Sequence, residues 1–240
     1  MRDQAAAWVA GQVGHNVLVA CDALTCADLA QHGFPAADLN ILQSTAPDLY
    51  GTQVVVVTAS VRSQFGAQLA SVFAPEVLAS FGTGANRIDI RAIAPDGPAT
   101  FRAALNADVL ARKIAGAQLL TRSTITASAS ARNALVAGDV DARLLTVLAF
   151  LASQQPIAIV SFGGAARGAS QGVPLHIADL AAADPAAGKD GAAYGRSLLT
   201  LLHSEVGLYV PTSVAAVRLG TGQHAVQITF AAPSPLGLLG

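Results

Sequence analysis

The sequence predicts an α/β protein, with a mostly parallel sheet in the first half and a smaller α+β module in the second. Short apolar runs alternate with helical segments through the first half, which is typical of βαβ units. The run Gln53–Thr58 (QVVVVT) has four consecutive valines, as expected for a parallel strand covered on both faces. Helical segments become longer after residues 95–97 (Pro-Asp-Gly). We therefore expect a Rossmann-like α/β domain over residues 1–120 and an α+β domain over residues 121–240.

In the first half, each expected helix or strand follows from the spacing of its apolar residues. Thr25 is expected to cap the second helix, and Gly33 to end it. The segment Arg87–Ile93 (RIDIRAI) alternates with period two, which predicts an edge or hairpin strand. The other expected strands cover residues 16–20, 39–42, 53–58 and 77–81, and the expected helices and helical turns cover residues 3–13, 26–31, 60–65 and 67–73.

The second half is predicted to follow a long helix over residues 98–120, because Pro98 suits the first turn of a helix. Asp141 stands at the start of another helical segment, where a carboxylate favours the helix dipole. Residues 231–240 are rich in Pro, Gly and Leu and are expected to be loose. The remaining expected helices cover residues 129–137, 141–154 and 192–204, and the expected strands cover residues 124–128, 157–161, 174–177, 214–219 and 225–230.

The composition excludes several classes of protein. The chain has 240 residues, a formal net charge of -1, 12% charged residues and 52% hydrophobic residues, whereas about 25% of residues are charged in a typical domain. Disorder requires low hydrophobicity and high net charge, so it is excluded, and without excess positive charge we expect no nucleic-acid partner. The longest apolar run, Leu144–Ala152, is far shorter than the ~20 residues that span a bilayer. The first residues lack the apolar core of a secretory signal, and their abrupt start is compatible with an excised domain.

The two cysteines, Cys21 and Cys26, have two structural interpretations. In a reducing compartment they are expected as buried thiols. In an oxidising compartment they are candidates for a short-loop disulfide at the start of a helix. Their four intervening residues do not form a redox C-x-x-C motif, and two sulfurs alone do not form a zinc site.

Two groups of residues in the second half are candidate ligand-binding residues. The small-residue loop 161–170 contains Arg167 and follows an expected strand, so it either borders a binding cleft or serves as a connector. His176 and Asp179 are close in sequence, and His224 lies in the expected terminal hairpin. These three side chains are candidates for a shared site, and the alternative is that they are surface or internally hydrogen-bonded groups.

Residues 3–94 resemble the extracytoplasmic region of multi-spanning actinobacterial membrane proteins, including glycosyltransferases that use lipid-linked sugars. The resemblance rests on Asp28-Leu29, on Gly33-Phe34-Pro35 and on the motif Phe81-Gly82-x-Gly84-x-x-Arg87-Ile88. Cys26 stands where those proteins often have an aromatic residue. The resemblance implies an extracytoplasmic location and a link to the membrane through segments absent from this chain. The transferase chemistry belongs to those segments, so no catalytic residue is carried over.

Residues 129–230 are similar to zinc D,D-carboxypeptidases and hedgehog-like peptidoglycan hydrolases, through the segments VDARLL, GVPLHIADL and HAVQITF. Against the metal-binding pattern of those enzymes, the first histidine falls near Gly163 or Gly164 and the aspartate falls on His176. The terminal H-x-H pair falls on Ala225 and Gln227, while Phe230 keeps its place. Catalytic zinc needs three protein ligands. The resemblance therefore implies a peptidase-like module that holds no metal.

These observations favour a non-catalytic extracytoplasmic binding or interaction domain of a membrane protein, which contacts a cell-envelope component or a protein partner. Its candidate ligand-binding residues are His176, Asp179, His224 and Arg167, and we expect no catalytic residue, metal or cofactor. One alternative is a hydrolase or transferase acting on cell-wall peptide or lipid-linked sugar, which requires the first three side chains to converge within ~5 Å. Another is a cytosolic small-molecule binder that uses the carboxyl edge of the parallel sheet, which free thiols at both cysteines would favour.

Overall fold

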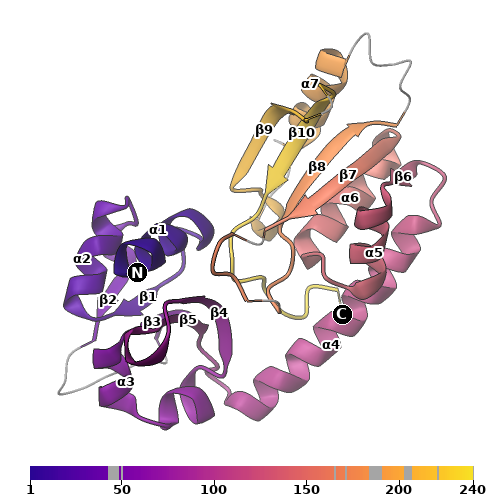
Figure 1. The fold of residues 1–240 in the computed structure, drawn as a ribbon. Coiled ribbons are helices and arrows are strands. Elements are labelled where there is room, and N and C mark those ends of the chain that lie inside the picture. Colours follow the sequence, from indigo (N-terminus) through magenta and orange to yellow (C-terminus); the bar gives the residue numbers. More distant parts are fainter. Residues whose placement is uncertain are drawn as a thin grey trace. The chain divides into compact units, whose positions relative to one another are not determined.

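The protein is a mixed α/β protein with two five-stranded mixed sheets (Figure 1). The computed structural model describes residues 1–42, 49, 51–164, 166–170, 172–183, 191–202, 207–220 and 222–239. The chain forms two compact units, of which the first contains Met1–Ala104 and Ala165–Val173 and the second contains Leu105–Gly164 and Pro174–Gly240. The division thus falls inside the long helix and not at residue 120, and a segment of the second half returns to the first unit. Within the described part of the chain, no helix combines the length and the apolar character needed to cross a membrane.

The sheet of the first unit has the strand order β2-β1-β3-β5-β4. Its strands are β1 (Val19–Cys21), β2 (Leu39–Ile41), β3 (Val54–Val57), β4 (Glu76–Phe81) and β5 (Ile88–Ala92). Strand β1 pairs in parallel with β2 and β3, whereas β5 is antiparallel to β3 and β4. The expectation of a mostly parallel sheet is therefore wrong, because the short connection between β4 and β5 makes them a hairpin, and a hairpin is antiparallel.

The helices of the first unit are α1 (Arg2–Gln12), α2 (Ala23–Gln31) and α3 (Ala59–Phe65), with shorter turns at Ala36–Asp38, Leu69–Phe73 and Gly84–Asn86. Helix α2 begins earlier than predicted, because Asp22 and not Thr25 is its cap. The Asp22 carboxylate accepts a hydrogen bond from the Thr25 backbone N–H at 2.9 Å. An aspartate before the first turn satisfies one of the amides that the helix leaves unpaired.

The segment 166–170 extends the first sheet along its β4 edge. The Ser80 N–H donates to the Gly168 carbonyl at 2.8 Å, and the Ser170 N–H donates to the Leu78 carbonyl at 2.9 Å. Gly168 has a φ of +98°, and a Cβ atom there would lie 2.6 Å from the Phe81 ring. Glycine is therefore required where this segment crosses Phe81.

The sheet of the second unit has the order β6-β7-β8-β10-β9. Its strands are β6 (Ile125–Ala127), β7 (Ile157–Gly163), β8 (Ile177–Ala182), β9 (Ser213–Arg218) and β10 (His224–Thr229). Only the β6–β7 pairing is parallel among these described strands. The strand predicted at residues 174–177 starts at Ile177 instead, because Leu175 forms an isolated bridge with Val140 before the chain enters the sheet.

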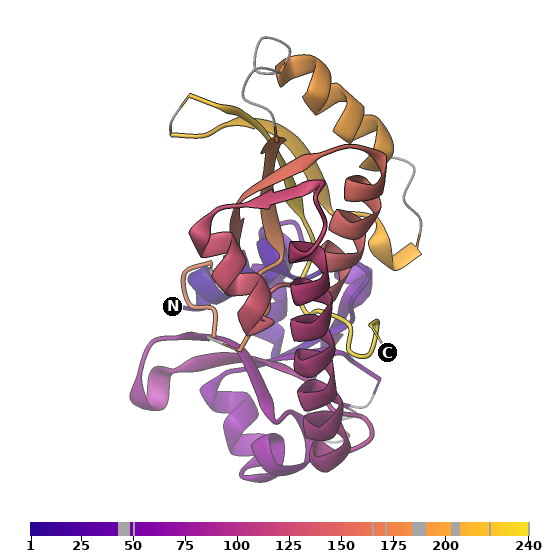
Figure 2. The same ribbon diagram turned by 90° about the vertical axis from the view of Figure 1, so that its right-hand side faces the viewer.

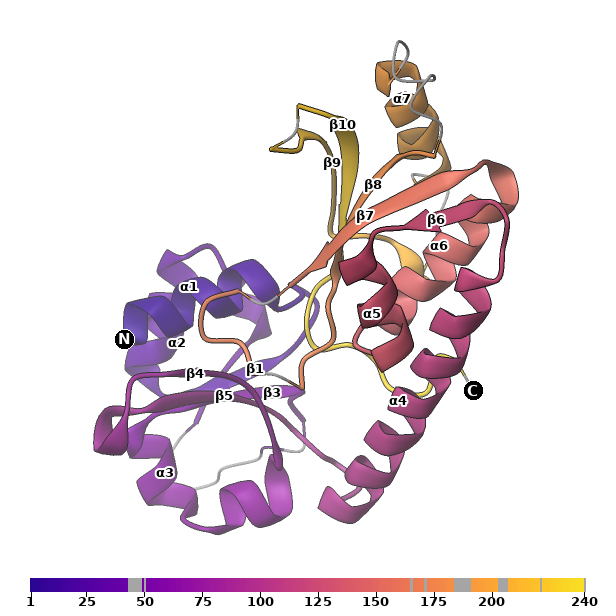
Figure 3. The same cartoon turned by 45° about the vertical axis from the view of Figure 1, so that its right-hand side comes forward.

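The helices of the second half are α4 (Pro98–Leu120), α5 (Ala129–Ala137), α6 (Ala142–Gln154) and α7 (Gly191–Leu202), followed by a turn at Gly207–Tyr209. Residues 203 and 204, where the last helix was expected to end, lie outside the described residues. Figure 3 shows α5 and α6 beside strands β6 and β7. Leucines of α6 and α7 pack with alternate residues of β7, β8 and β10 in one core. The opposite face of these strands carries alanines and the polar side chains that are described next.

Candidate functional site

The structure separates His176, Asp179 and His224, the three residues expected to share a site. Asp179 of β8 lies opposite Gln227 of β10. His176 precedes β8, and its carbonyl accepts a hydrogen bond from the Phe230 N–H, just beyond the end of β10. His224 begins β10, so it lies about 20 Å from His176 along the strand, since a strand rises about 3.4 Å per residue. The shifted site that the enzyme alternative required is not formed. Among the described residues, no three His, Cys, Asp or Glu side chains are grouped to hold a metal ion.

His176 is an interior residue with 2% of its surface exposed. Its Nδ1 lies 3.1 Å from the Pro174 carbonyl oxygen. Burial lowers the pKa of His176 and the Arg143 charge acts in the same direction, which outweighs the opposing effects of Pro174 and Asp141. The imidazole is therefore neutral at pH 7.

Gly164, one of the two positions where a metal-binding histidine was expected by resemblance, leaves no room for a side chain. This glycine has a φ of +133°, and a Cβ atom on it would lie 2.8 Å from His176 Nδ1. Any side chain there would be strained and would collide with the imidazole. Gly164 and His176 therefore pack directly against each other, whereas a Cβ atom on Gly163, the other expected position, would make only an ordinary 3.7 Å contact with Ile177.

The Asp179 carboxylate accepts hydrogen bonds from side chains on both neighbouring strands. Ser161 Oγ on β7 donates to Asp179 Oδ2 at 2.6 Å, and Gln227 Nε2 on β10 donates to Asp179 Oδ1 at 2.9 Å. The three residues face one another in register. This polar row links three strands through cross-strand pairs, which is a structural role.

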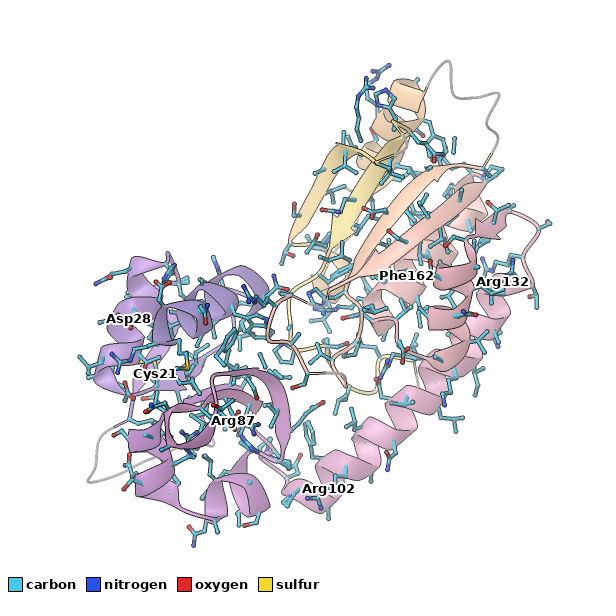
Figure 4. The ribbon with its side chains drawn as sticks, viewed as in Figure 1. Cys21, Asp28, Arg87, Arg102, Arg132 and Phe162 are labelled. Carbon is cyan, nitrogen blue, oxygen red and sulfur yellow. A yellow bond between two sulfur atoms is a disulfide. The ribbon has the colours of Figure 1, made fainter. Side chains whose placement is uncertain are left out.

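Arg167 and the cysteines belong to the first unit. Arg167 is exposed and lines a cavity with residues of α1 and β4. Cys21 and Cys26 are joined in a disulfide, with their Cα atoms 5.5 Å apart, and Figure 4 shows the bond beside the Cys21 label. The bond connects the end of β1 to the first turn of α2 and encloses Asp22.

A polar pair lies where the two parallel strands β1 and β3 end. Asp22 follows β1 and Thr58 follows β3, and Thr58 Oγ donates to Asp22 Oδ2 at 2.5 Å. Strand β2 lies on one side of β1 and β3 on the other. Helices that leave adjacent strands in opposite directions open a crevice at the carboxyl ends of the strands, where ligands bind in open α/β sheets. The sequence signal for this pair is a polar residue directly after each apolar strand.

A cavity of about 610 Å³ opens at this pair. Leu24, Leu42 and Ile88 supply part of its apolar lining. Its polar lining consists of Arg2, Asp22, Thr58, Ser60, Gln64 and Asn86. The volume suits a small ligand, and the mixed lining suits one that carries both polar groups and apolar surface.

The Asp22 carboxylate is held in its charged form. Burial by itself would raise its pKa, but hydrogen bonds from Thr58 and Thr25 and the charge of Arg2 outweigh burial and lower it. Each carboxylate oxygen accepts one of the two hydrogen bonds. An ionised carboxylate has about four acceptor positions, so roughly two remain for a donor in the cavity.

Comparisons with protein-family models, with curated proteins and with solved structures found no match for this chain. The functional assignment therefore depends on the site itself.

Proposed function

We propose that this chain is a non-catalytic ligand-binding domain whose main site is the cavity at the carboxyl ends of β1 and β3. The proposed ligand is a neutral, hydroxyl-rich small molecule, such as the saccharide part of a cell-envelope component. The observation that carries this proposal is the Asp22 carboxylate, which is ionised, fixed by Thr58 and Thr25, and provided with free acceptor positions.

The lining of the cavity favours hydroxyl groups over phosphate. Hydroxyls donate to a carboxylate, and the amides of Gln64 and Asn86 are of the type that both donates and accepts. Leu24 is 64% exposed and offers apolar surface to the C–H face of a sugar ring. Phosphate commonly binds at a helix start beside such strands, but here the Asp22 carboxylate already occupies the start of α2 and would repel it.

The second unit supports a non-catalytic role. Gly164 and His176 pack against each other, and Asp179 is hydrogen-bonded on both oxygens. We propose that this unit is a peptidase-like module used for support or for contact with a protein partner.

The disulfide supports an extracytoplasmic location for the domain, since disulfides persist in oxidising compartments. It disfavours the cytosolic alternative, which called for free thiols. The parallel order β2-β1-β3 is compatible with a Rossmann-like description of this part of the first unit. We propose that the membrane connection lies in segments outside this chain.

Binding of neutral sugars is the test of the proposal. A panel of glucose, galactose, N-acetylglucosamine and their disaccharides is titrated by NMR, with glucose 6-phosphate as the charged comparator. We expect saturable shifts at Asp22 and Thr58 with a neutral sugar and weaker binding of the phosphate ester. The proposal is overturned if no sugar shifts these residues or if the phosphate ester binds more tightly.

A matched pair of variants tests the role of Asp22. Asn caps a helix as well as Asp does, so Asp22→Asn keeps the start of α2 and removes the charge. A hydrogen bond to a charged group contributes about 1.5–3 kcal/mol, so we expect an affinity loss of roughly 10-fold to 100-fold. Asp96→Asn, at an exposed position of the first unit and outside the lining, is the control and should keep wild-type affinity.

A further inference from the structure

The first unit contains a second cavity, of about 470 Å³, which is distinct in its lining from the one at Asp22. Three of its residues, Gln4, Trp8 and Gln12, lie four residues apart on one face of α1. The end of β4 contributes Ser80–Gly82, and the returning segment contributes Ala166–Gly168. We propose that this cavity binds the carboxylate group of a monoanionic ligand, with Arg167 as its cation.

The charge of the lining is positive and unbalanced. Arg167 is the charged residue of the lining, its side chain is exposed, and it forms no ion pair or hydrogen bond with any part of the chain that the structure describes. The nearby acid is Asp89, which accepts a hydrogen bond from Ser80 of the lining. Asp89 is already paired with Arg87 and Arg91, at 2.6 and 3.5 Å. Its negative charge is therefore matched by two other cations, and Arg167 remains available.

The other polar groups of the lining include several hydrogen-bond donors. The indole N–H of Trp8 is buried and has no acceptor among the described residues. Buried donors nearly always have a partner, so an oxygen atom of the ligand is the candidate acceptor for this N–H. The amide of Gln4 is a further donor. A cation together with neutral donors is the complement of an oxyanion.

The single cation favours a carboxylate over a phosphate. The planar guanidinium of Arg167 forms two parallel hydrogen bonds with either group. A phosphate monoester carries a charge of about -1.5 to -2 at pH 7, which one arginine does not neutralise, whereas a carboxylate carries one negative charge. The position of Arg167 is also preorganised, because the next residue, Gly168, packs on Phe81 and pairs with Ser80. Preorganisation reduces the entropy lost on binding.

The fluorescence of Trp8 provides a direct test, since it is the one tryptophan of the chain. The probe is N-acetylalanine, with N-acetylalaninamide as the uncharged analogue of the same shape and inorganic phosphate as the second anion. We expect N-acetylalanine to change the Trp8 emission saturably and the amide to bind at least tenfold more weakly. Equal responses to the acid and the amide, or tighter binding of phosphate, would overturn the proposal.

Variants of Arg167 distinguish the effect of its positive charge from the effect of its two parallel hydrogen bonds. Arg167→Gln should weaken binding at least tenfold, and Arg167→Lys should lie between it and the wild type, because lysine keeps the charge and loses the two-bond geometry. Arg102→Gln, on the exposed face of α4 (Figure 4), is the control and should bind as the wild type does. Asp22→Asn should also leave this response unchanged, which makes the test independent of the sugar site. If Arg167→Gln bound N-acetylalanine with wild-type affinity, Arg167 would not be the cation of this site.

Discussion

At the scale of single residues, two ionisable groups, the half-buried Asp22 and the buried His176, are held in opposite charge states. Asp22 is kept ionised because hydrogen bonds from Thr58 and Thr25 outweigh the cost of its burial. His176 is kept neutral because burial and Arg143 outweigh its favourable partners. The first arrangement leaves acceptor positions available to a ligand. The second arrangement has a packing role: the neutral imidazole of His176 lies against Gly164, where strand β7 ends and β8 begins.

His176 should make the stability of the second unit depend on pH. Its pKa lies below the ordinary value of 6.5 in the folded state, so between the two values the unfolded chain binds more protons. The free energy of unfolding should therefore fall as the pH is lowered through 6.5, by at most about 1.4 kcal/mol per pH unit for this one group. Urea unfolding at several pH values between 7.5 and 5 measures the slope.

The comparison variants for this prediction are His176→Gln and His224→Gln. The first removes the titrating group and should flatten the slope, although it also lowers stability at all pH values. The second replaces an exposed side chain and should keep the wild-type slope. An identical slope in wild type and His176→Gln would show that another group is responsible.

At the scale of elements, α4 and α5 approach each other through a glycine. A Cβ atom on Gly116 of α4 would lie 2.9 Å from the Leu135 carbonyl carbon of α5. Beside this contact, Arg112 of α4 forms an ion pair with Asp108 and donates to the Gly138 carbonyl at the end of α5. Figure 2 shows α4 running as one long magenta helix alongside α5. The glycine is therefore needed for close backbone packing, which helix propensity alone would not favour.

Alanine substitution of two helical glycines should have opposite effects. Gly→Ala in a helix normally stabilises by roughly 0.5–1 kcal/mol, and Gly11→Ala in α1 should do so, because nothing lies within 4 Å of the added atom. Gly116→Ala should instead destabilise by about 1–3 kcal/mol, because the added methyl overpacks the α4–α5 contact. Denaturant unfolding of both variants measures the signs. Stabilisation by Gly116→Ala would contradict the close packing of these helices.

At the scale of the whole molecule, some of the scarce charged residues lie inside the protein. Only 12% of the residues are charged, yet Asp108–Arg112 and Asp141–Arg143 are buried ion pairs. Both pairs also bond to backbone groups, Arg112 to Gly138 and Arg143 to Ala231. A buried pair costs desolvation, and removing one partner leaves an uncompensated charge. Low charge content therefore does not mean that the ionisable residues are peripheral to the fold.

The disulfide makes the stability of the protein depend on whether its surroundings are oxidising or reducing. Cys21 and Cys26 are five residues apart, and closing so short a loop in the unfolded chain corresponds to about 2 kcal/mol of stability. Addition of a reducing agent should lower the free energy of unfolding by about that amount. The Cys21→Ala/Cys26→Ala variant serves as the control and should not respond to the reductant. The disulfide would be contradicted if alkylation and mass spectrometry detected free thiols at Cys21 and Cys26 in protein purified without reductant.

Local features of the chain were predicted well from the sequence. The helices expected at residues 98–120 and 129–137 form over those residues, and the strand expected at 53–58 is the buried strand β3. Apolar spacing, capping residues and proline act within one or two helical turns, so their effects are visible in a short stretch of sequence. The wrong cap at Thr25 is a local error, because Asp22 is the stronger carboxylate cap three residues earlier.

The tertiary structure decided how the strands pair and which side chains lie close together. Which strands are antiparallel, where the chain divides and which side chains meet all depend on residues far apart in sequence. His176, Asp179 and His224 were candidates for a shared site, but His224 begins β10 whereas His176 lies beside Phe230, just beyond the other end of that strand. Asp22 and Thr58 form the candidate site because β1 and β3 are adjacent parallel strands. The sequence by itself determined the helices, the apolar strands and the low charge, while only tertiary packing decided which polar residues share a cavity, since hydrogen bonds and cavities depend on distances in space.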